Sequence, residues 1–259
     1  MFYLHKKSSK KIKEEVKTSD TIIVPFGSLE SHGAHNAVGS CYLLAEKASK
    51  DVGEKTGISV TPVIPFGVSY SFKKLHGTLT VSSEALSKYT QEVCESLIRS
   101  GFKKIAFFSA HGGNLSVLRE LSNHLRDKYG VLCAVVHLWS QLKKATPNYN
   151  TVFWDPDLVL GHGGEPVTSV MMHLFPEVVD LNEAVWEPLS QPFTKFKTTS
   201  EDSHKYKDLS WNIMLSVDEV GYTGDPRRGS AEKGKILYNN LITKLVEFIE
   251  AFSELETKA

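Results

Sequence analysis

The feature of this sequence that most constrains its fold is the alternation of short apolar runs with segments of helical periodicity. Four apolar runs are predicted to be strands, at residues 21–26, 59–65, 104–109 and 131–138. Three segments with helical spacing separate them, at residues 41–55, 83–99 and 114–128. Because strands spaced by helices of this length are typical of parallel βαβ units, the sequence predicts an α/β fold with a mostly parallel central sheet.

The second half of the chain is less regular. The pattern breaks over residues 141–160, where Pro147, Asn148 and Asn150 occur, and this stretch is predicted to form a loop or lid. Helix is expected over residues 165–175 and over the closing amphipathic segment 231–252. Residues 191–211 are polar and aromatic without a clear period, and we interpret them as an irregular segment that extends toward a neighbouring subunit. We predict a single domain over residues 1–259.

Composition excludes some classes of partner and compartment. Lys and Arg together number 30, equal to Asp and Glu, so there is no electrostatic argument for binding nucleic acid. Three scattered cysteines do not make a disulfide framework. The N-terminal residues lack the apolar core of a signal peptide, and no apolar run approaches the roughly 20 residues that span a bilayer. We therefore expect a cytoplasmic protein with neither membrane nor nucleic acid as a partner.

Polar, glycine-flanked segments directly follow three predicted strands. They occupy residues 26–35, 67–71 and 109–114, and a fourth such cluster covers residues 161–169. Ligands of open parallel sheets bind beyond the carboxyl ends of the strands, where these segments are expected to meet. The sequence therefore places the candidate site at that edge of the sheet.

Several residues in these segments suit a metal. Glu30 and His32 lie two positions apart, which puts their side chains on one side of an extended segment. Carboxylate and imidazole are ordinary ligands of zinc, manganese and iron. The alternative is a helix-capping glutamate and a surface histidine. His111 precedes two glycines that let a ligand approach closely. His35 is interpreted mainly as a structural histidine in a turn, with a role as third metal ligand as the alternative.

Other polar residues have two readings each. Asn114 either caps the helix that follows or contacts substrate. Glu165 either favours a helix dipole or takes a metal or catalytic role with His162. Thr168 and Ser169 are expected to pack or cap.

Five motifs in order, between about residues 22 and 245, resemble the creatininase family of amidohydrolases. Residues 25–35 look like its Pro-x-Gly-Ser-x-Glu-x-His-Gly-x-His, and residues 109–114 like its Asn-Gly-His-Gly-Gly-Asn. The remaining three matches are Gly77-Thr78, residues 162–169, and residues 224–227 with 231–234. The resemblance implies a three-layer α/β/α sandwich, a metal site that is often binuclear, and hexamers built from dimers.

The resemblance also implies roles for individual residues. Glu30, His32 and His111 are the implied metal ligands, and His162 matches the family's active-site histidine, a general acid or base. Glu165 is included among the metal-site candidates, and Trp139 falls near a substrate-pocket tryptophan.

The sequence departs from the family at the metal site itself. Cys41 occupies the position of an aspartate that bridges two metals, near a helix N-terminus that favours a thiolate. A thiolate binds zinc or iron in preference to manganese, so we expect one or two such ions with Cys41 as a candidate ligand. Gly113 replaces a carboxylate of creatininase, Val167 a glutamate, and Ser71-Phe72 a Glu-His pair that is often found there. Creatinine is therefore not the expected substrate.

The activity that follows is metal-assisted hydrolysis of a small molecule. A bound metal lowers the pKa of water from about 15.7 toward about 7, and His162 would carry a proton to the leaving group. The expected bond is a C–N bond in a small cyclic amide or formamide. Two alternatives are ring opening of a cyclic polyol ketone and a degenerate, non-catalytic member that binds a metabolite.

Overall fold

The computed structural model describes residues 2–149, 161–186 and 222–257 and has four parallel strands at its centre. The strands are β1 (Thr21–Phe26), β2 (Ser59–Val60), β3 (Lys104–Ser109) and β4 (Leu132–His137), in the order β2-β1-β3-β4. Among the described strands, β1 and β3 are interior and every neighbouring pair is parallel, so the α/β prediction is confirmed.

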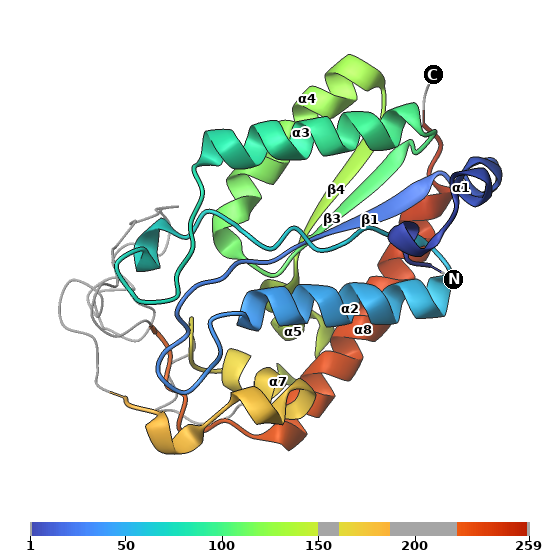
Figure 1. Cartoon of the computed structure of the whole chain (residues 1–259). Helices are drawn as coiled ribbons and strands as arrows, with labels where there is room; N and C mark the ends of the chain where they lie inside the picture. The colour runs from blue at the N-terminus through green and yellow to red at the C-terminus, as the bar shows by residue number, and fades with distance from the viewer. Residues whose placement is uncertain (1, 150–160, 187–221, 258–259) are drawn as a thin grey trace, which may run out of the picture.

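Helices cover both faces of the sheet, which confirms the three-layer arrangement (Figure 1). On one face lie α3 (Ser83–Arg99) and α4 (Leu115–Tyr129). On the other lie α2 (Ser40–Thr56), α5 (Leu138–Ala145), α7 (Val167–Leu174) and α8 (Ala231–Glu254). Shorter elements are α1 (Ser9–Glu15) and the 3-10 turns Leu4–Lys6, Tyr70–Phe72, Gly112–Asn114, Pro176–Val178 and Leu181–Glu183.

The period of two along each strand divides the apolar core into two halves. Ile22 and Val24 pack with α3 and α4, whereas Ile23 packs with α2 and α8. In β3, Ile105 and Phe107 face the first layer while Ala106 and Phe108 face the second. A strand covered on both faces is apolar at nearly every position, which is why β1 and β3 appear as continuous apolar runs.

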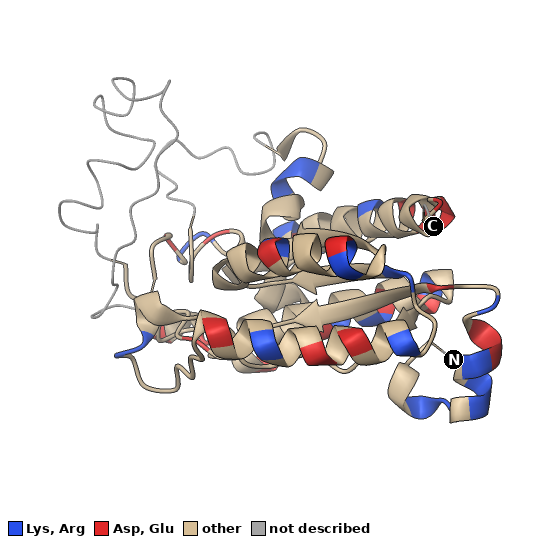
Figure 2. Cartoon of the chain, turned by 90° about the horizontal axis from the view of Figure 1, so that it is seen from above, with Lys and Arg blue, Asp and Glu red and all other residues tan. Residues whose placement is uncertain are grey.

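Charged residues of both signs are interspersed along the helices, whereas the strands are mostly uncharged (Figure 2). None of the helices in the described ranges combines the length and apolarity needed to cross a membrane.

Two predicted elements need correction. The second strand ends at Val60 instead of residue 65, because Pro62 and Pro65 have no N–H to continue the ladder. Residues 141–145, predicted as loop, belong to α5, whose Leu138, Leu142 and Ala145 are buried. The rest of that predicted lid from residue 150, and the irregular segment 191–211, lie outside the described residues.

Candidate metal centre

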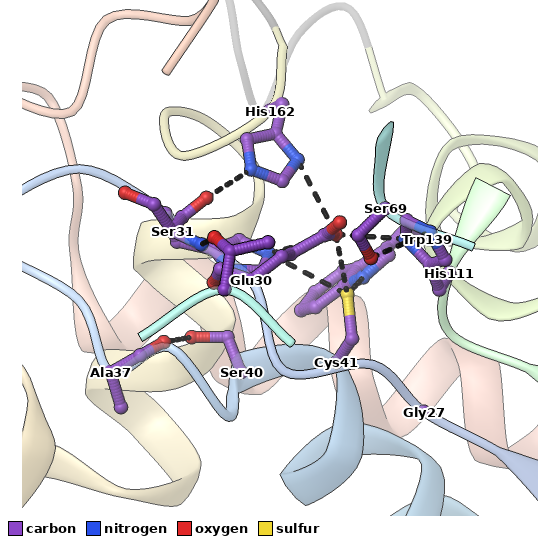
Figure 3. Close-up of polar contacts among 12 residues, drawn as sticks. Gly27, Glu30, Ser31, Ala37, Ser40, Cys41, Ser69, His111, Trp139 and His162 are labelled. Atoms are coloured by element: carbon purple, nitrogen blue, oxygen red, sulfur yellow. Dashed lines mark hydrogen bonds and ion pairs between the residues drawn. The ribbon is translucent and has the colours of Figure 1, made fainter. Parts of the chain in front are cut away.

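The Glu30 carboxylate lies at the centre of the polar cluster beyond the carboxyl ends of β1 and β3 (Figure 3). It is 0% exposed, in the loop after β1, and its backbone N–H donates to the Val38 carbonyl. The next residue is fixed as well, because Ser31 N–H donates to the Thr78 hydroxyl at 3.0 Å. The Gly-Thr motif therefore holds the loop that carries the carboxylate.

Four side chains converge on one oxygen of this carboxylate. Glu30 Oε1 lies 2.8 Å from His111 Nδ1 and 3.7 Å from Cys41 Sγ. It lies 3.9 Å from His162 Nδ1 and 4.0 Å from His32 Nε2. Within the described ranges, Oε2 has no hydrogen-bond partner. A buried, unpaired carboxylate oxygen is costly, and a cation at this point would satisfy it.

In each of the three histidines, the ring nitrogen that points away from the Glu30 carboxylate (the outer nitrogen) faces a backbone carbonyl, which orients the ring. The nitrogen–oxygen distances are 2.9 Å from His32 Nδ1 to Glu30 O, 2.8 Å from His111 Nε2 to Val68 O, and 2.6 Å from His162 Nε2 to Ser31 O. A carbonyl only accepts, so each outer nitrogen carries the hydrogen and the inner nitrogen of a neutral ring offers a lone pair. Histidines that bind metals are held in this way.

The charges of this group are strongly coupled. Burial raises the pKa of Glu30, but His111, His162 and His32 outweigh it and hold that pKa well below its usual range. Burial lowers the pKa of His111, but Glu30 and Cys41 raise it well above its ordinary value. Burial and the neighbouring His162 lower the pKa of His32 to about 3. Without an ion, the proton of the group therefore lies between His111 and Glu30.

Cys41 lies in the first turn of α2 and is 2% exposed. Its sulfur is 3.5 Å from His32 Nε2 and accepts a hydrogen bond from Trp139 Nε1 at 3.3 Å. Burial is the main cause that raises the pKa of the thiol. Trp139, in α5, thus reaches the site through the sulfur.

Among the described residues, two groups of ligand atoms are compact enough for an ion. One comprises Glu30, Cys41 and His111, and the other Glu30, His32 and His162, with all ligand atoms of a group within 4.8 Å of one another. Carboxylate, thiolate and imidazole suit zinc or iron, so the residues present fit the divalent metal that the motifs imply.

Glu165 and Asn114 are placed differently from expectation. Glu165 accepts hydrogen bonds from Ser169 N at 3.1 Å and Ser169 Oγ at 2.6 Å, which ties it to the first turn of α7, and it belongs to neither ligand group. Asn114 is 0% exposed, so it offers no surface to a substrate, and its side chain makes no capping bond to α4. It accepts from Val68 N and donates to Gly27 O, each at 3.1 Å.

The remaining predicted residues have structural contacts. His35 Nε2 lies 3.1 Å from the Thr168 hydroxyl, in keeping with the structural reading. The loop carrying His162 is held by Thr223, which directly precedes the motif at residues 224–227. His162 N–H donates to Thr223 Oγ1, and Thr223 N–H donates to His162 O.

Two residues at the site were not predicted from the sequence to contact the histidines. The Phe72 ring stacks on the His162 ring with centroids 4.1 Å apart. The Ser69 hydroxyl lies 3.3 Å from His111 Nε2. Ser69 belongs to the polar segment 67–71, which gave a signal. Phe72 stood out only as a departure from the family's Glu-His pair, and nothing in the sequence indicated that its ring packs on His162.

Comparisons with known proteins agree with this architecture. The family model described as creatininase, creatinine amidohydrolase, matches residues 5–249. The chain is 29% identical over 265 residues to the 3-dehydro-scyllo-inosose hydrolase of Thermotoga maritima, covering 97% of this chain and 84% of the relative. It is 24% identical over 242 residues to a mycofactocin precursor peptide peptidase of Mycobacterium ulcerans, covering 90% and 85%.

Solved structures show the same fold. A creatinine amidohydrolase structure aligns with a TM-score of 0.80 at 21% identity over 98% of both chains. A structure described as the manganese form of creatininase aligns with a TM-score of 0.78 at 20% identity, covering 98% of this chain and 99% of that one. The parallel sheet and its helical layers are thus shared with these proteins.

Proposed function

Because this chain belongs to the creatininase family, whose members are metal-dependent hydrolases, we propose that it cleaves a C–N bond in a small cyclic amide or formamide. The proposed ligands of its divalent metal are Glu30, His32, Cys41 and His111. Zinc or iron is the proposed metal, because a thiolate is among the ligands.

The convergence of three carbonyl-oriented histidines and one thiol on the buried Glu30 carboxylate carries this proposal. A buried carboxylate with an unpartnered oxygen serves no packing purpose, and its contacts come from segments far apart in the sequence. An ion held there supplies a Lewis acid that activates water near neutral pH and polarises a carbonyl.

The residues around the ligands prepare the site for that ion. Ser109 Oγ donates to the His111 carbonyl and accepts from His111 N–H, which fixes the turn that presents the ring. The proton shared by His111 and Glu30 has to leave when an ion binds, so metal binding releases a proton. Trp139 donates to the sulfur of Cys41 and Phe72 packs on His162, which gives the site aromatic walls that suit a small planar group.

Gly113 supports a substrate other than creatinine. A Cβ atom there would lie 2.0 Å from the Val68 carbonyl oxygen and 2.5 Å from His111 Nε2. No side chain fits at this position without moving the hydrogen bond that orients His111. The carboxylate that creatininase has at this point is therefore incompatible with the present arrangement.

The proposed activity is tested by stripping the protein of metal, reloading it with zinc, iron(II) or manganese, and assaying formamides, cyclic amides and short peptides. We expect metal-dependent release of amine or formate. His111→Ala should remove the ion and the turnover together, whereas His124→Ala, an exposed position on α4, should retain both. Metal-loaded protein that turns over none of these substrates would contradict the proposal.

Ring opening of a cyclic polyol ketone is the second candidate. The 29% identity to an enzyme named 3-dehydro-scyllo-inosose hydrolase, over nearly the whole chain, favours it. Adding such a ketone to the assay tests this candidate, and turnover of the ketone without any C–N cleavage would favour it. Binding of a metabolite with no turnover of any substrate would instead indicate the non-catalytic alternative.

A further inference from the structure

We propose that Thr78 and Thr80 are positioning residues for two of the proposed metal ligands, His32 and His111. Each threonine hydroxyl acts on its histidine through one backbone peptide group. The hydroxyl holds the N–H of that group, and the C=O of the same group holds the ring. The inference deepens the proposed function and rests on it, because it takes both histidines to be ligands of the metal.

Thr78 acts on His32 through the peptide group between Glu30 and Ser31. The Ser31 N–H donates to Thr78 Oγ1 at 3.0 Å. The C=O of this group, that of Glu30, accepts from His32 Nδ1–H at 2.9 Å. A peptide group is planar, and in the trans form found here its N–H and C=O point in opposite directions. Fixing the N–H therefore fixes the direction of the carbonyl that orients His32.

Thr80 repeats this arrangement on the other side of the site. The Ser69 N–H donates to Thr80 Oγ1 at 2.9 Å, and the C=O of the same trans peptide group, that of Val68, accepts from His111 Nε2–H at 2.8 Å. The proton of the Thr80 hydroxyl is directed to the Val81 carbonyl at 3.3 Å, which leaves its lone pairs for Ser69. The hydroxyl is thus held as an acceptor.

The two threonines come from one short segment, residues 78–80, that joins both loops. Its β-bridges pair Leu79 with Leu29 and Thr80 with Gly67. Residues two positions apart in such a segment share a face. Both threonines are accordingly partly buried, whereas Leu79 between them is 51% exposed. A single segment therefore sets the orientation of a histidine in each of the two loops.

The chemistry of the hydrogen bonds makes this more than a tie between loops. In each chain a hydroxyl accepts from an N–H whose carbonyl accepts from an imidazole, and bonds in such chains polarise one another. Partners of this kind fix the tautomer and orientation of a metal-binding histidine and raise its basicity. Without the hydroxyl, the N–H of Ser31 or Ser69 is left unpaired, and turning the peptide group to pair it moves the carbonyl away from the ring.

The test measures zinc affinity of the full-length protein by competition with a chelator. Valine has the shape of threonine without the acceptor, so Thr78→Val and Thr80→Val should each weaken zinc binding by about tenfold or more. Thr78→Ser and Thr80→Ser keep the hydroxyl and should restore the affinity. Thr56→Val is the matched control, because Thr56 Oγ1 also accepts a backbone N–H, that of Ile58, but lies at the opposite end of α2 from the first turn.

Cobalt(II)-loaded protein gives a spectroscopic readout, since the visible bands of this ion report the geometry of its ligands. The two valine variants should have altered bands, and the serine and Thr56→Val variants the wild-type bands. Thermal unfolding of metal-free protein shows what each change costs the fold alone. Valine variants that lose stability but keep the zinc affinity and cobalt spectrum of the wild type would overturn the inference, because the threonines would then only join the loops.

These outcomes are separate from those of the proposed function. Wild-type protein that binds zinc and hydrolyses nothing would contradict the proposed function and leave the affinities of the threonine variants to decide the inference. Hydrolysis with equal zinc affinity in all variants would do the reverse. If a valine variant fails to fold, the alanine variant at the same position replaces it, since it lacks the same acceptor and adds no bulk. It should show the same loss of affinity, and wild-type affinity would overturn the assignment for that threonine.

Discussion

At the scale of single residues, Cys41 is the position where this chain differs most from its family. Its sulfur lies 3.7 Å from Glu30 Oε1 and 3.5 Å from His32 Nε2, within the range of shared coordination. We predict that Cys41→Asp shifts metal preference toward manganese, because a carboxylate is a harder ligand than a thiolate. Cys41→Ser should weaken zinc binding sharply.

Competition between zinc and manganese, measured by metal content after dialysis, checks this prediction. Cys133→Ser provides the matched control, because that cysteine lies in β4 and packs into the other half of the core. If Cys41→Ser keeps its metal content and its activity unchanged, the sulfur only packs.

His137 gives a prediction for acid stability. It ends β4, and burial, followed by the charges of His111 and Arg119, lowers its pKa to about 4. A histidine with a lowered folded-state pKa stabilises the fold above its unfolded pKa of about 6.5, and this stability is lost as the pH falls toward 4. We expect wild-type metal-free protein to lose up to about 3 kcal/mol from this group over that range. Urea unfolding measured at several pH values should show a smaller fall in the free energy of unfolding of His137→Gln than of the wild type as the pH drops from 6.5 to 4. An equal fall in both proteins would refute the assignment.

The residue scale also shows how far sequence reasoning reaches. The proximity of Glu30, His32 and His111 could be predicted because each follows a strand in a polar, glycine-flanked segment, whereas their role as metal ligands stays a prediction. Glu165 could not be assigned, since a glutamate before a helix looks the same whether it binds a metal or Ser169. The orientation of His162 depends on a carbonyl 131 residues earlier in the chain, and no local pattern encodes it.

At the scale of elements, boundaries were predictable where local chemistry defines them. Helix α3 has the predicted bounds, Ser83–Arg99, and its first turn is capped by the Ser82 hydroxyl, which accepts from Ala85 N–H. Helix α5 was missed because it begins directly after β4 without an intervening turn. Its buried positions 138, 142 and 145 do follow helical spacing, so the signal was present but short.

Asn114 joins elements in a way that mutagenesis can measure. Its amide links the loop after β1, through the Gly27 carbonyl, to the loop before α3, through Val68 N–H. Asn114→Ala leaves both buried backbone groups unpaired, so we predict a loss of about 2–3 kcal/mol in the free energy of unfolding. Denaturant unfolding of metal-free protein measures it, with Asn123→Ala on the exposed face of α4 as the control. Equal stability of the two variants would contradict the prediction.

At the scale of the whole molecule, assembly stays a prediction. The family resemblance implies a hexamer, and among the described residues β4 is the edge strand of the sheet, with all of its residues only partly buried. We expect light scattering at micromolar protein concentration to give a mass near six times the 28.8 kDa of one chain. A monomer at that concentration would count decisively against it. The cytoplasmic location inferred from composition likewise remains a prediction.

The convergence of distant segments on Glu30 has a thermodynamic consequence. Ligand atoms from α2, from the loops after β1 and β3, and from the loop before α7 come together only when both core layers are complete. The unfolded chain therefore has no equivalent site, and an ion that binds only the native state shifts the folding equilibrium by mass action. At a free ion concentration of about 100 times the dissociation constant, this linkage adds about 2.7 kcal/mol per site. A chelator should thus lower the melting temperature, and the size of that shift reports on occupancy without a known substrate.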